Sequence, residues 1–92
     1  MVSVKRLVLD VLKPHQPNAL DFCRRIAQLG VDYEVCLDVE EVDENTQTLS
    51  LDIRGGDVDM GAIEAAIADM GASLHSVDKV EVHNEEADGE QA

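Results

Sequence analysis

The sequence predicts an α+β protein with the ferredoxin-like βαββαβ order, a four-stranded antiparallel sheet in the strand order 4-1-3-2, and two helices on one face. Two observations predict this fold. The apolar segment Leu7–Leu12 has a counterpart in Leu49–Ile53, and each is followed by one helix-like stretch that ends at a glycine. Between the two halves, apolar and polar residues alternate as in a strand. Two βαβ halves that are joined by a hairpin and have right-handed crossovers give this topology, in which we expect the first and third strands to be parallel central neighbours.

The first half is predicted to run from a strand at about Val4–Leu12 into a helix at about Pro17–Leu29. Every second residue of the strand is apolar, so one of its faces enters the core. Proline suits the first helical turn, where no amide N–H is required. Gly30 is expected to stop the helix in the left-handed conformation. The positions expected to be buried are Leu7, Leu9, Val11, Ala19, Phe22, Cys23, Ile26 and Leu29.

The middle of the chain has the clearest strand pattern, which begins at Val31 and alternates as far as Val39. The alternation slips by one residue at Glu40–Val42, which indicates a β-bulge before the polar turn Asp43–Thr46. A third strand at about Gln47–Arg54 is expected to bury Leu49, Leu51 and Ile53.

The second half begins after Gly55 and Gly56, where Asp57 or Asp59 is expected to cap a helix that Gly71 closes. Its apolar stripe comprises Met60, Ile63, Ala66, Ile67 and Met70. A less regular strand follows at about Leu74–Val82. The sequence thus predicts one ferredoxin-like domain over residues 1–83 and an acidic disordered tail over residues 84–92.

Charge excludes several classes of partner. Twenty acidic against seven basic residues give a net charge of −13, which repels nucleic acids and anionic membrane surfaces. RNA-binding sheets of this topology need exposed aromatic and basic side chains, whereas the outward positions here are acidic. Such acidity with few lysines is typical of a salt-rich, halophilic cytosol, where screening makes it tolerable. The two cysteines lack CxxC spacing, and no signal peptide or long apolar run is present, so we expect a cytoplasmic protein.

Two aspartates are the strongest candidates for a metal site. Asp10 and Asp52 occupy equivalent positions of the two halves and are expected on the uncovered face of the sheet, where neighbouring carboxylates repel each other unless a cation lies between them. We predict a Ca²⁺ or Mg²⁺ site that is completed by oxygens such as those of Asp38 or Ser50. The alternative is that arginine or lysine side chains, or solvent, neutralise the same carboxylates; the candidates are Arg6, Arg54 and Lys79.

Polar residues are also predicted to meet at one end of the sheet, where the first and third strands would end and the fourth would begin. Two helix N-termini would present free N–H groups there, which favours a small anion. The alternatives are that Gly55 and Gly56 form only a turn and that His75, at the start of the fourth strand, has a structural role. No nucleophile and base are shown within reach of each other, so no catalytic residue is assigned. The predicted ligand-binding residues are Lys13, His15, Gly55, Gly56, His75, Ser76 and Asp78.

The uncovered face also predicts self-association. Val8 and Leu12 lie there among charged residues, and a one-sided sheet rarely leaves such side chains in water without a partner. The second strand lies at the sheet edge and is acidic, so cations or basic groups of a neighbouring subunit would be needed to neutralise its charge.

Three motifs resemble a family of small archaeal proteins, DUF211, over about Lys5–Val82. These motifs are LVLDVLKPH from Leu7, VEEVDENT from Val39 and HSVDKV from His75. The resemblance implies a ferredoxin-like fold, ring-shaped homo-oligomers and no established activity. The family motifs map onto Asp10, Lys13, Pro14, Asp43, Thr46, His75, Ser76 and Asp78, while Arg54 departs from the family's more typical acidic residue.

These observations together predict a cytoplasmic homo-oligomer that binds a divalent cation on its acidic open face. The alternative is a regulatory module that senses a small anion at a subunit interface.

Overall fold

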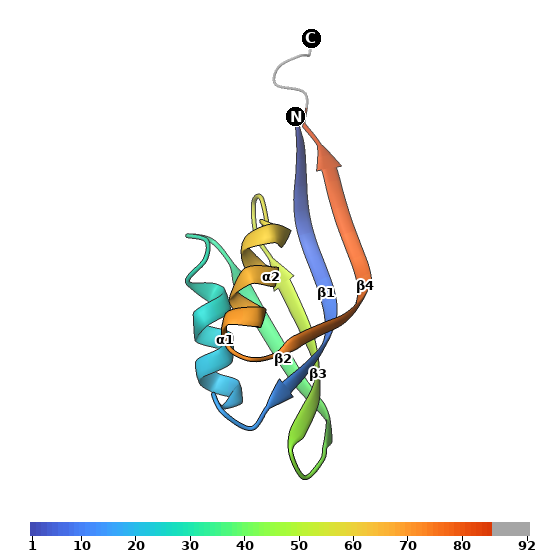
Figure 1. The fold of residues 1–92 in the computed structure, drawn as a ribbon. Helices are drawn as coiled ribbons and strands as arrows, with labels where there is room; N and C mark the ends of the chain where they lie inside the picture. The colour runs from blue at the N-terminus through green and yellow to red at the C-terminus, as the bar shows by residue number, and fades with distance from the viewer. Residues whose placement is uncertain (86–92) are drawn as a thin grey trace.

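Six elements follow one another as strand, helix, strand, strand, helix and strand, so the predicted ferredoxin-like βαββαβ layout is confirmed (Figure 1). They are β1 (Val2–Pro14), α1 (Ala19–Ala27), β2 (Glu34–Val42), β3 (Thr46–Arg54), α2 (Met60–Asp69) and β4 (Ser73–Asn84). This computed structural model describes residues 1–85 of the chain. Within them, neither helix is long and apolar enough to cross a membrane.

The four strands form one antiparallel sheet in the order β2-β3-β1-β4, which is β4-β1-β3-β2 when it is counted from the opposite edge. The expectation that the first and third strands run parallel is wrong, because β1 pairs antiparallel with β3. The crossover through α1 leaves β1 and β2 pointing the same way, and the tight hairpin then reverses β3. This reversal changes which residues share an end of the sheet.

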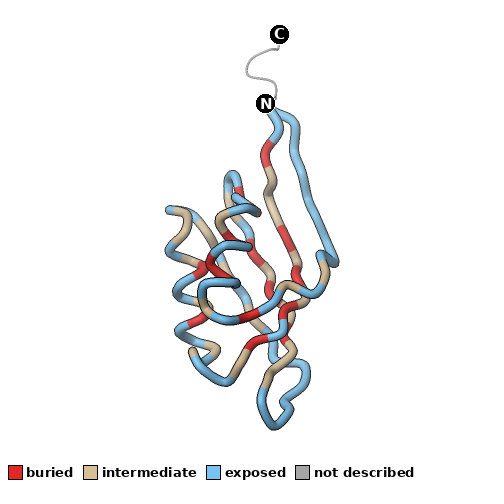
Figure 2. The backbone as a smooth tube through the Cα atoms, viewed as in Figure 1, coloured by how far each residue is buried: buried red, intermediate tan, exposed pale blue. Residues whose placement is uncertain are grey.

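Both helices cover the same face of the sheet, and the core lies between the two layers (Figures 1 and 2). The aliphatic positions that the sequence assigned to β1 and β3 are buried there, with at most 3% of any of them exposed. From the helices, Phe22, Ile26, Ile63 and Ile67 complete the core. The two-residue period in the strands and the helical spacing of the apolar stripes produce this packing.

The two helices end differently. Gly71 follows α2 with a φ of +79°, the left-handed conformation that glycine adopts without strain, as the sequence predicted. Gly30 was expected to do the same for α1, but α1 ends at Ala27 with Gln28 as its C-cap, and Gly30 is not among the glycines with positive φ. Gly30 instead makes room for Tyr33, whose ring a Cβ at this position would strike.

The β2–β3 hairpin confirms the predicted bulge, since the register shifts between Val39 and Glu41. The strand starts later than predicted. Val31 is fully exposed in a turn, and β2 begins at Glu34. Tyr33, just before the strand, turns toward the start of α2, where its hydroxyl oxygen accepts a hydrogen bond from the amide of Asp59 at 2.7 Å.

The outer parts of β1 and β4 extend beyond the helical layer as a two-stranded arm, in which Val2–Val4 pair with Val82–Asn84 (Figure 1). The molecule is accordingly elongated, with extents of 57 × 22 × 18 Å. Asn84, which the sequence analysis placed in the tail, is the last residue of β4, and Glu85 N–H donates to the carbonyl of Met1. The rest of the predicted tail, residues 86–92, lies outside the described residues.

Candidate functional site

The helix-free face of the sheet carries most of the predicted metal-site residues. Residues that are partners across neighbouring strands share a face, so the register arranges them in rows. One row consists of Asp38, Ser50, Asp10 and Ser76, and the next consists of Cys36, Asp52, Val8 and Lys79. Asp10 and Asp52 therefore lie on the same uncovered face, in adjacent rows.

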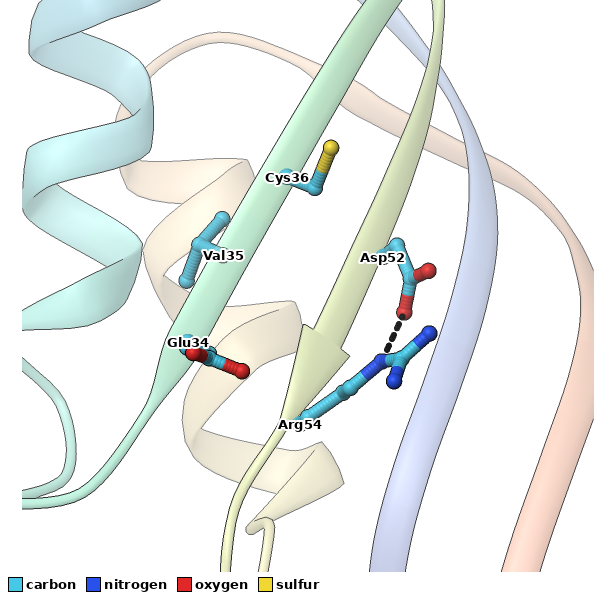
Figure 3. A pocket seen from close by; sticks show the side chains of 5 residues that line it. All are labelled: Glu34, Val35, Cys36, Asp52 and Arg54. Carbon is cyan, nitrogen blue, oxygen red and sulfur yellow. Dashed lines mark ion pairs between the residues drawn. The ribbon is translucent and has the colours of Figure 1, made fainter.

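Asp52 is neutralised by arginine. Arg6 donates from Nε and Nη2 to the two carboxylate oxygens at 3.0 and 2.8 Å, and Nε of Arg54 lies 3.7 Å from Oδ1 (Figure 3). The hydrogen bonds from Arg6 are the main reason that the pKa of Asp52 lies below its ordinary value. Of the alternatives that the sequence left open, pairing with Arg6 and Arg54 is therefore the one that the structure shows for Asp52.

Asp10 is only half satisfied. Its Oδ2 lies 3.0 Å from Nδ1 of His75, whereas its Oδ1 is buried and has no hydrogen-bond partner among the described residues. A hollow of about 220 Å³ opens beside it, and its walls are Asp10, Val11, Leu12, Thr48 and His75. Asp10 is thus the carboxylate of this face that has a buried oxygen without a partner among the described residues.

A second hollow, of about 360 Å³, lies toward the β2 edge of the same face (Figure 3). Its walls are Glu34, Val35, Cys36, Asp52 and Arg54. It is a shallow groove of mixed charge in which Arg54 and Asp52 form an ion pair.

The three predicted metal ligands do not form a closed coordination sphere. Asp38 shares a row with Asp10 but is exposed on the edge strand, and Asp52 is held by its arginines. Within residues 1–85, no three side chains of the histidine, cysteine, aspartate or glutamate type form a metal-sized group.

The expectation that the predicted anion-site residues converge at one end of the sheet is wrong, because its members lie at different places. The antiparallel pairing puts Lys13 opposite Gln47, whereas the amide of Gly55 donates to the carbonyl of Lys5 at the other end of β1. Gly56 follows Gly55 there, and His15 instead reaches the β2–β3 turn, with Nε2 at 3.1 Å from the carbonyl of Asp43.

The β4 members of that set remain close to one another. The hydroxyl of Ser76 donates to Oδ1 of Asp78 at 2.8 Å, and His75 contacts Asp10 on the open face. Within residues 1–85, none of these three forms a hydrogen bond or ion pair with Lys13 or Gly55, so the anion-sensing alternative loses the cluster on which it depended.

Lys13 has a structural environment that the sequence did not indicate. Its side chain is fully buried, and Nζ donates to the carbonyls of Pro14 and Pro17 at 2.8 and 2.6 Å. Burial lowers the pKa of this ammonium group. Lys13 therefore holds the loop between β1 and α1 and is not available to a solvent-borne anion.

The helix N-termini are occupied by their own side chains. Asn18 Oδ1 accepts the amide of Asp21 at 2.8 Å, and Asp59 Oδ1 accepts the amide of Ala62 at 3.1 Å. Since β1 and β3 run in opposite directions, the two helix starts also lie at opposite ends of the sheet. These N–H groups do not converge on one anion site.

A second surface, which the sequence analysis missed, is apolar. On the helix side of β4, Val77, Val80 and Val82 are 46–54% exposed, because the helices do not reach them. Val2 of the same arm is 61% exposed. The signal in the sequence was the alternation of valine with charged or polar residues in Val80–His83, but the length of the arm depends on where α2 stops.

Comparison with known proteins identifies relatives of undetermined function. A family model described as DUF211, Uncharacterized ArCR, matches residues 5–89. An uncharacterized protein of Methanocaldococcus jannaschii is 34% identical over 80 residues, a stretch that covers 87% of this chain and 82% of that protein.

Proposed function

The chain belongs to the DUF211 family of uncharacterized proteins, and from that premise we propose that it is a self-assembling protein whose protomers cover one another's projecting β1–β4 arm. The observation that carries this proposal is the arm itself. Beyond the helical layer it has two strands, and its helix-side face presents Val2 and Val82 to solvent; Val80, which precedes the arm on β4, is also exposed.

A two-stranded ribbon is marginally stable in water by itself, and stability requires a third strand or packing against an apolar surface. The described residues provide neither for the outer half of the arm (Figure 2). A second copy of the chain supplies both an edge strand and an apolar surface. Self-assembly is therefore the simplest way to remove these valines from water.

The net charge of −13 opposes assembly at low ionic strength. Screening lengths fall from about 10 Å at 0.1 M salt to about 3 Å at 1 M, so a salt-rich cytoplasm reduces the repulsion between acidic protomers. The proposal thus includes a cytoplasmic, halophilic setting in which the acidity is compatible with close contact.

Size-exclusion chromatography with light scattering tests the proposal. In 1–2 M KCl the screening length is about 3 Å or less, so repulsion between acidic protomers is weak. Under these conditions we expect a mass that is a multiple of the 10.0 kDa protomer mass. A monomer under these conditions, over the whole accessible concentration range, would overturn the proposal.

A second candidate function is binding of a divalent cation, for which the buried and unpartnered Oδ1 of Asp10 is the supporting observation. Asp10 would contribute the central carboxylate, with the hydroxyl of Ser50 and the carboxylate of Asp38 in the same row. Oxygen ligands of this kind suit Ca²⁺ or Mg²⁺. Asp52 is not part of this revised set.

Calorimetric titration with CaCl₂ and with MgCl₂ tests this candidate. We expect heat of binding in the wild type, its loss in Asp10→Asn, and its retention in Asp21→Asn, which removes a carboxylate from the exposed surface of α1. Equal heats in all three proteins would show that the cation does not bind at Asp10.

A further inference from the structure

The two aspartates of the open face occupy equivalent positions. In the antiparallel register of β1 and β3, Leu9 pairs with Leu51. Residues that lie equally far along the two strands from this pair are therefore related by a local two-fold axis. Asp10 directly follows Leu9, and Asp52 directly follows Leu51. The surroundings of the two carboxylates can thus be compared position by position.

Two arginines surround Asp52. Arg6 lies three residues before Leu9 on β1, and Arg54 lies three residues after Leu51 on β3. Arg6 donates to the carboxylate at 3.0 and 2.8 Å, and Nε of Arg54 lies 3.7 Å from it (Figure 3). The chain itself therefore supplies the guanidinium groups that neutralise this carboxylate.

The equivalent positions around Asp10 are uncharged. The two-fold axis relates Arg6 to Thr48, and it relates Arg54 to Leu12. Among residues 1–85, no lysine or arginine forms an ion pair with the Asp10 carboxylate within 4.0 Å. The same backbone arrangement thus holds two built-in guanidinium groups at one aspartate and none at the other.

The hollow of about 220 Å³ opens at these uncharged positions. Thr48 and Leu12 both belong to its walls, together with Asp10, Val11 and His75. Leu12 is 41% exposed and gives the hollow an apolar side. Nδ1 of His75 lies 3.0 Å from Oδ2 of Asp10, and Oδ1 has no partner among the described residues. The hollow therefore combines an incompletely satisfied carboxylate with an apolar wall, as small-molecule sites do.

We propose that this hollow binds a small molecule that carries a guanidinium group on a short apolar stem. Its N–H groups donate to Asp10 as those of Arg6 donate to Asp52, and its stem packs against Leu12. A carboxylate has about four lone-pair sites, so Asp10 accepts from the ligand and from His75 at the same time. The His75 side chain is 77% exposed, so it can turn aside while the ligand enters.

Charge and burial favour an organic cation over a metal ion in the hollow. The net charge of −13 attracts cations, and the Asp10 side chain is only 25% exposed, so salt screens an ion pair there less than at the surface. A calcium ion needs about six to eight oxygen ligands. The side chains of the hollow offer one carboxylate and one hydroxyl, those of Asp10 and Thr48. The divalent-cation candidate uses Ser50 and Asp38, which do not line the hollow, so guanidinium binding goes beyond both proposed functions and depends on neither.

Calorimetric titration with butylguanidinium chloride in 1 M KCl tests the proposal, since salt at this concentration suppresses unspecific attraction of a cation to the acidic surface. We expect saturable binding in the wild type. In Asp10→Asn we expect binding to be about tenfold or more weaker, because the charge-assisted hydrogen bonds are lost. Equal affinities of the wild type and Asp10→Asn, or no binding in the wild type, would overturn the proposal.

Two controls accompany this titration. Asp38→Asn removes a carboxylate from the same row of the open face but outside the hollow, and we expect it to leave the affinity for butylguanidinium unchanged. Butylurea has the same stem without the charge, and we expect it not to bind. Butylurea that binds as tightly as butylguanidinium would show that the carboxylate does not recognise the ligand.

A second test supplies the missing arginine from within the chain. We expect Thr48→Arg to weaken butylguanidinium binding by about tenfold or more, and to raise the melting temperature by about 2–5 °C relative to Thr48→Val. The rise should disappear when Asp10→Asn is added. Thr48→Val keeps the size of the threonine, and we expect it to bind like the wild type. Equal binding by Thr48→Arg and Thr48→Val would contradict the assignment of the ligand to this hollow.

Amide NMR of isotope-labelled protein locates the ligand. During the titration we expect shifts at Leu12, Thr48 and His75 and none at Glu34 or Cys36, which line the other hollow of the open face. Shifts centred on Glu34 and Cys36 would place the ligand beside the ion pair of the other hollow and would overturn the inference. Circular dichroism of each variant establishes that the fold is retained.

Discussion

Arg6 donates two hydrogen bonds to the carboxylate of Asp52, at 3.0 and 2.8 Å, across the central strand pair of the sheet. Nε and Nη2 of the Arg6 guanidinium thus neutralise the carboxylate that the sequence assigned to a metal site. This contact explains why the charged face is stable around Asp52 without a cation. Asp10 is then the carboxylate of this face that still has an oxygen without a partner among the described residues.

We expect Asp52→Asn to lower the free energy of unfolding by about 1 kcal/mol at pH 7, because the amide cannot accept both charged hydrogen bonds. Arg6 depresses the pKa of Asp52 below the ordinary 3.8, so the unfolded state binds this proton more tightly. The stabilisation is therefore complete above about pH 4 and is lost as the pH falls through the folded-state pKa.

Urea unfolding of both proteins between pH 2 and 7 measures this effect. The difference between wild type and Asp52→Asn should shrink toward zero at the acid end. A difference that is independent of pH would contradict the assigned role of the Arg6–Asp52 pair.

Lys13→Met should lower the free energy of unfolding by about 2 kcal/mol, since it leaves the carbonyls of Pro14 and Pro17 without their buried donor. Lys5→Met is the matched control, because Lys5 makes a single hydrogen bond, to the carbonyl of Gly56, at a more exposed position. Similar losses in the two variants would argue against a special role of burial at Lys13.

The pH dependence of Lys13→Met has the same sign as that of Asp52→Asn, but it falls in the alkaline range. Burial depresses the pKa of Lys13 below 10.5, so the unfolded state binds the proton more tightly and the wild type gains stability as the pH rises toward that value. Thermal unfolding from pH 7 to 10 should therefore show a wild-type advantage over Lys13→Met that grows with pH. A shrinking advantage would mean that the charged form is favoured in the folded state.

The fold was predictable to the extent that local pattern determines it. Period-two alternation in Leu7–Val11 and Leu49–Ile53 gave the core face, and the slip at Glu40 gave the bulge. Strand direction depends on the connections and not on local pattern. The parallel assignment of the first and third strands therefore produced an anion site from residues, such as Lys13 and Gly55, that lie at opposite ends of β1.

The site was less predictable because pairings across strands depend on register. Asp10 and Asp52 were correctly placed on the open face, but the bidentate approach of Arg6 requires the alignment of Val8 with Asp52. Burial of Lys13 was not predictable, since a lysine after an apolar strand usually reaches solvent. The exposure of Val80 depends on how far the helices extend over the sheet.

The two thiols should differ in reactivity. Cys36 is exposed on β2, whereas Cys23 is partly buried and its pKa is raised, mainly by burial. We expect iodoacetamide at pH 8 to alkylate Cys36 first, as peptide mass spectrometry would show, because the thiolate is the reacting form. Equal rates at both positions would indicate that α1 opens away from β2 in solution.

Leu51→Ala should cost about 3 kcal/mol of unfolding free energy, since this fully buried side chain lies at the centre of β3. Ser50→Ala, one position along and on the open face, should change stability by less than about 1 kcal/mol. Chemical denaturation of both variants checks the assignment of faces, and a larger loss in Ser50→Ala would reverse it.

Amide hydrogen exchange over a dilution series in high KCl tests the central claim that a second copy covers β4. We expect the outward amides of Lys79–Asn84 to be protected at high protein concentration and to exchange rapidly at low concentration, while those on the free edge of β2 exchange rapidly throughout. Exchange of Lys79–Asn84 that does not change with concentration would contradict the account.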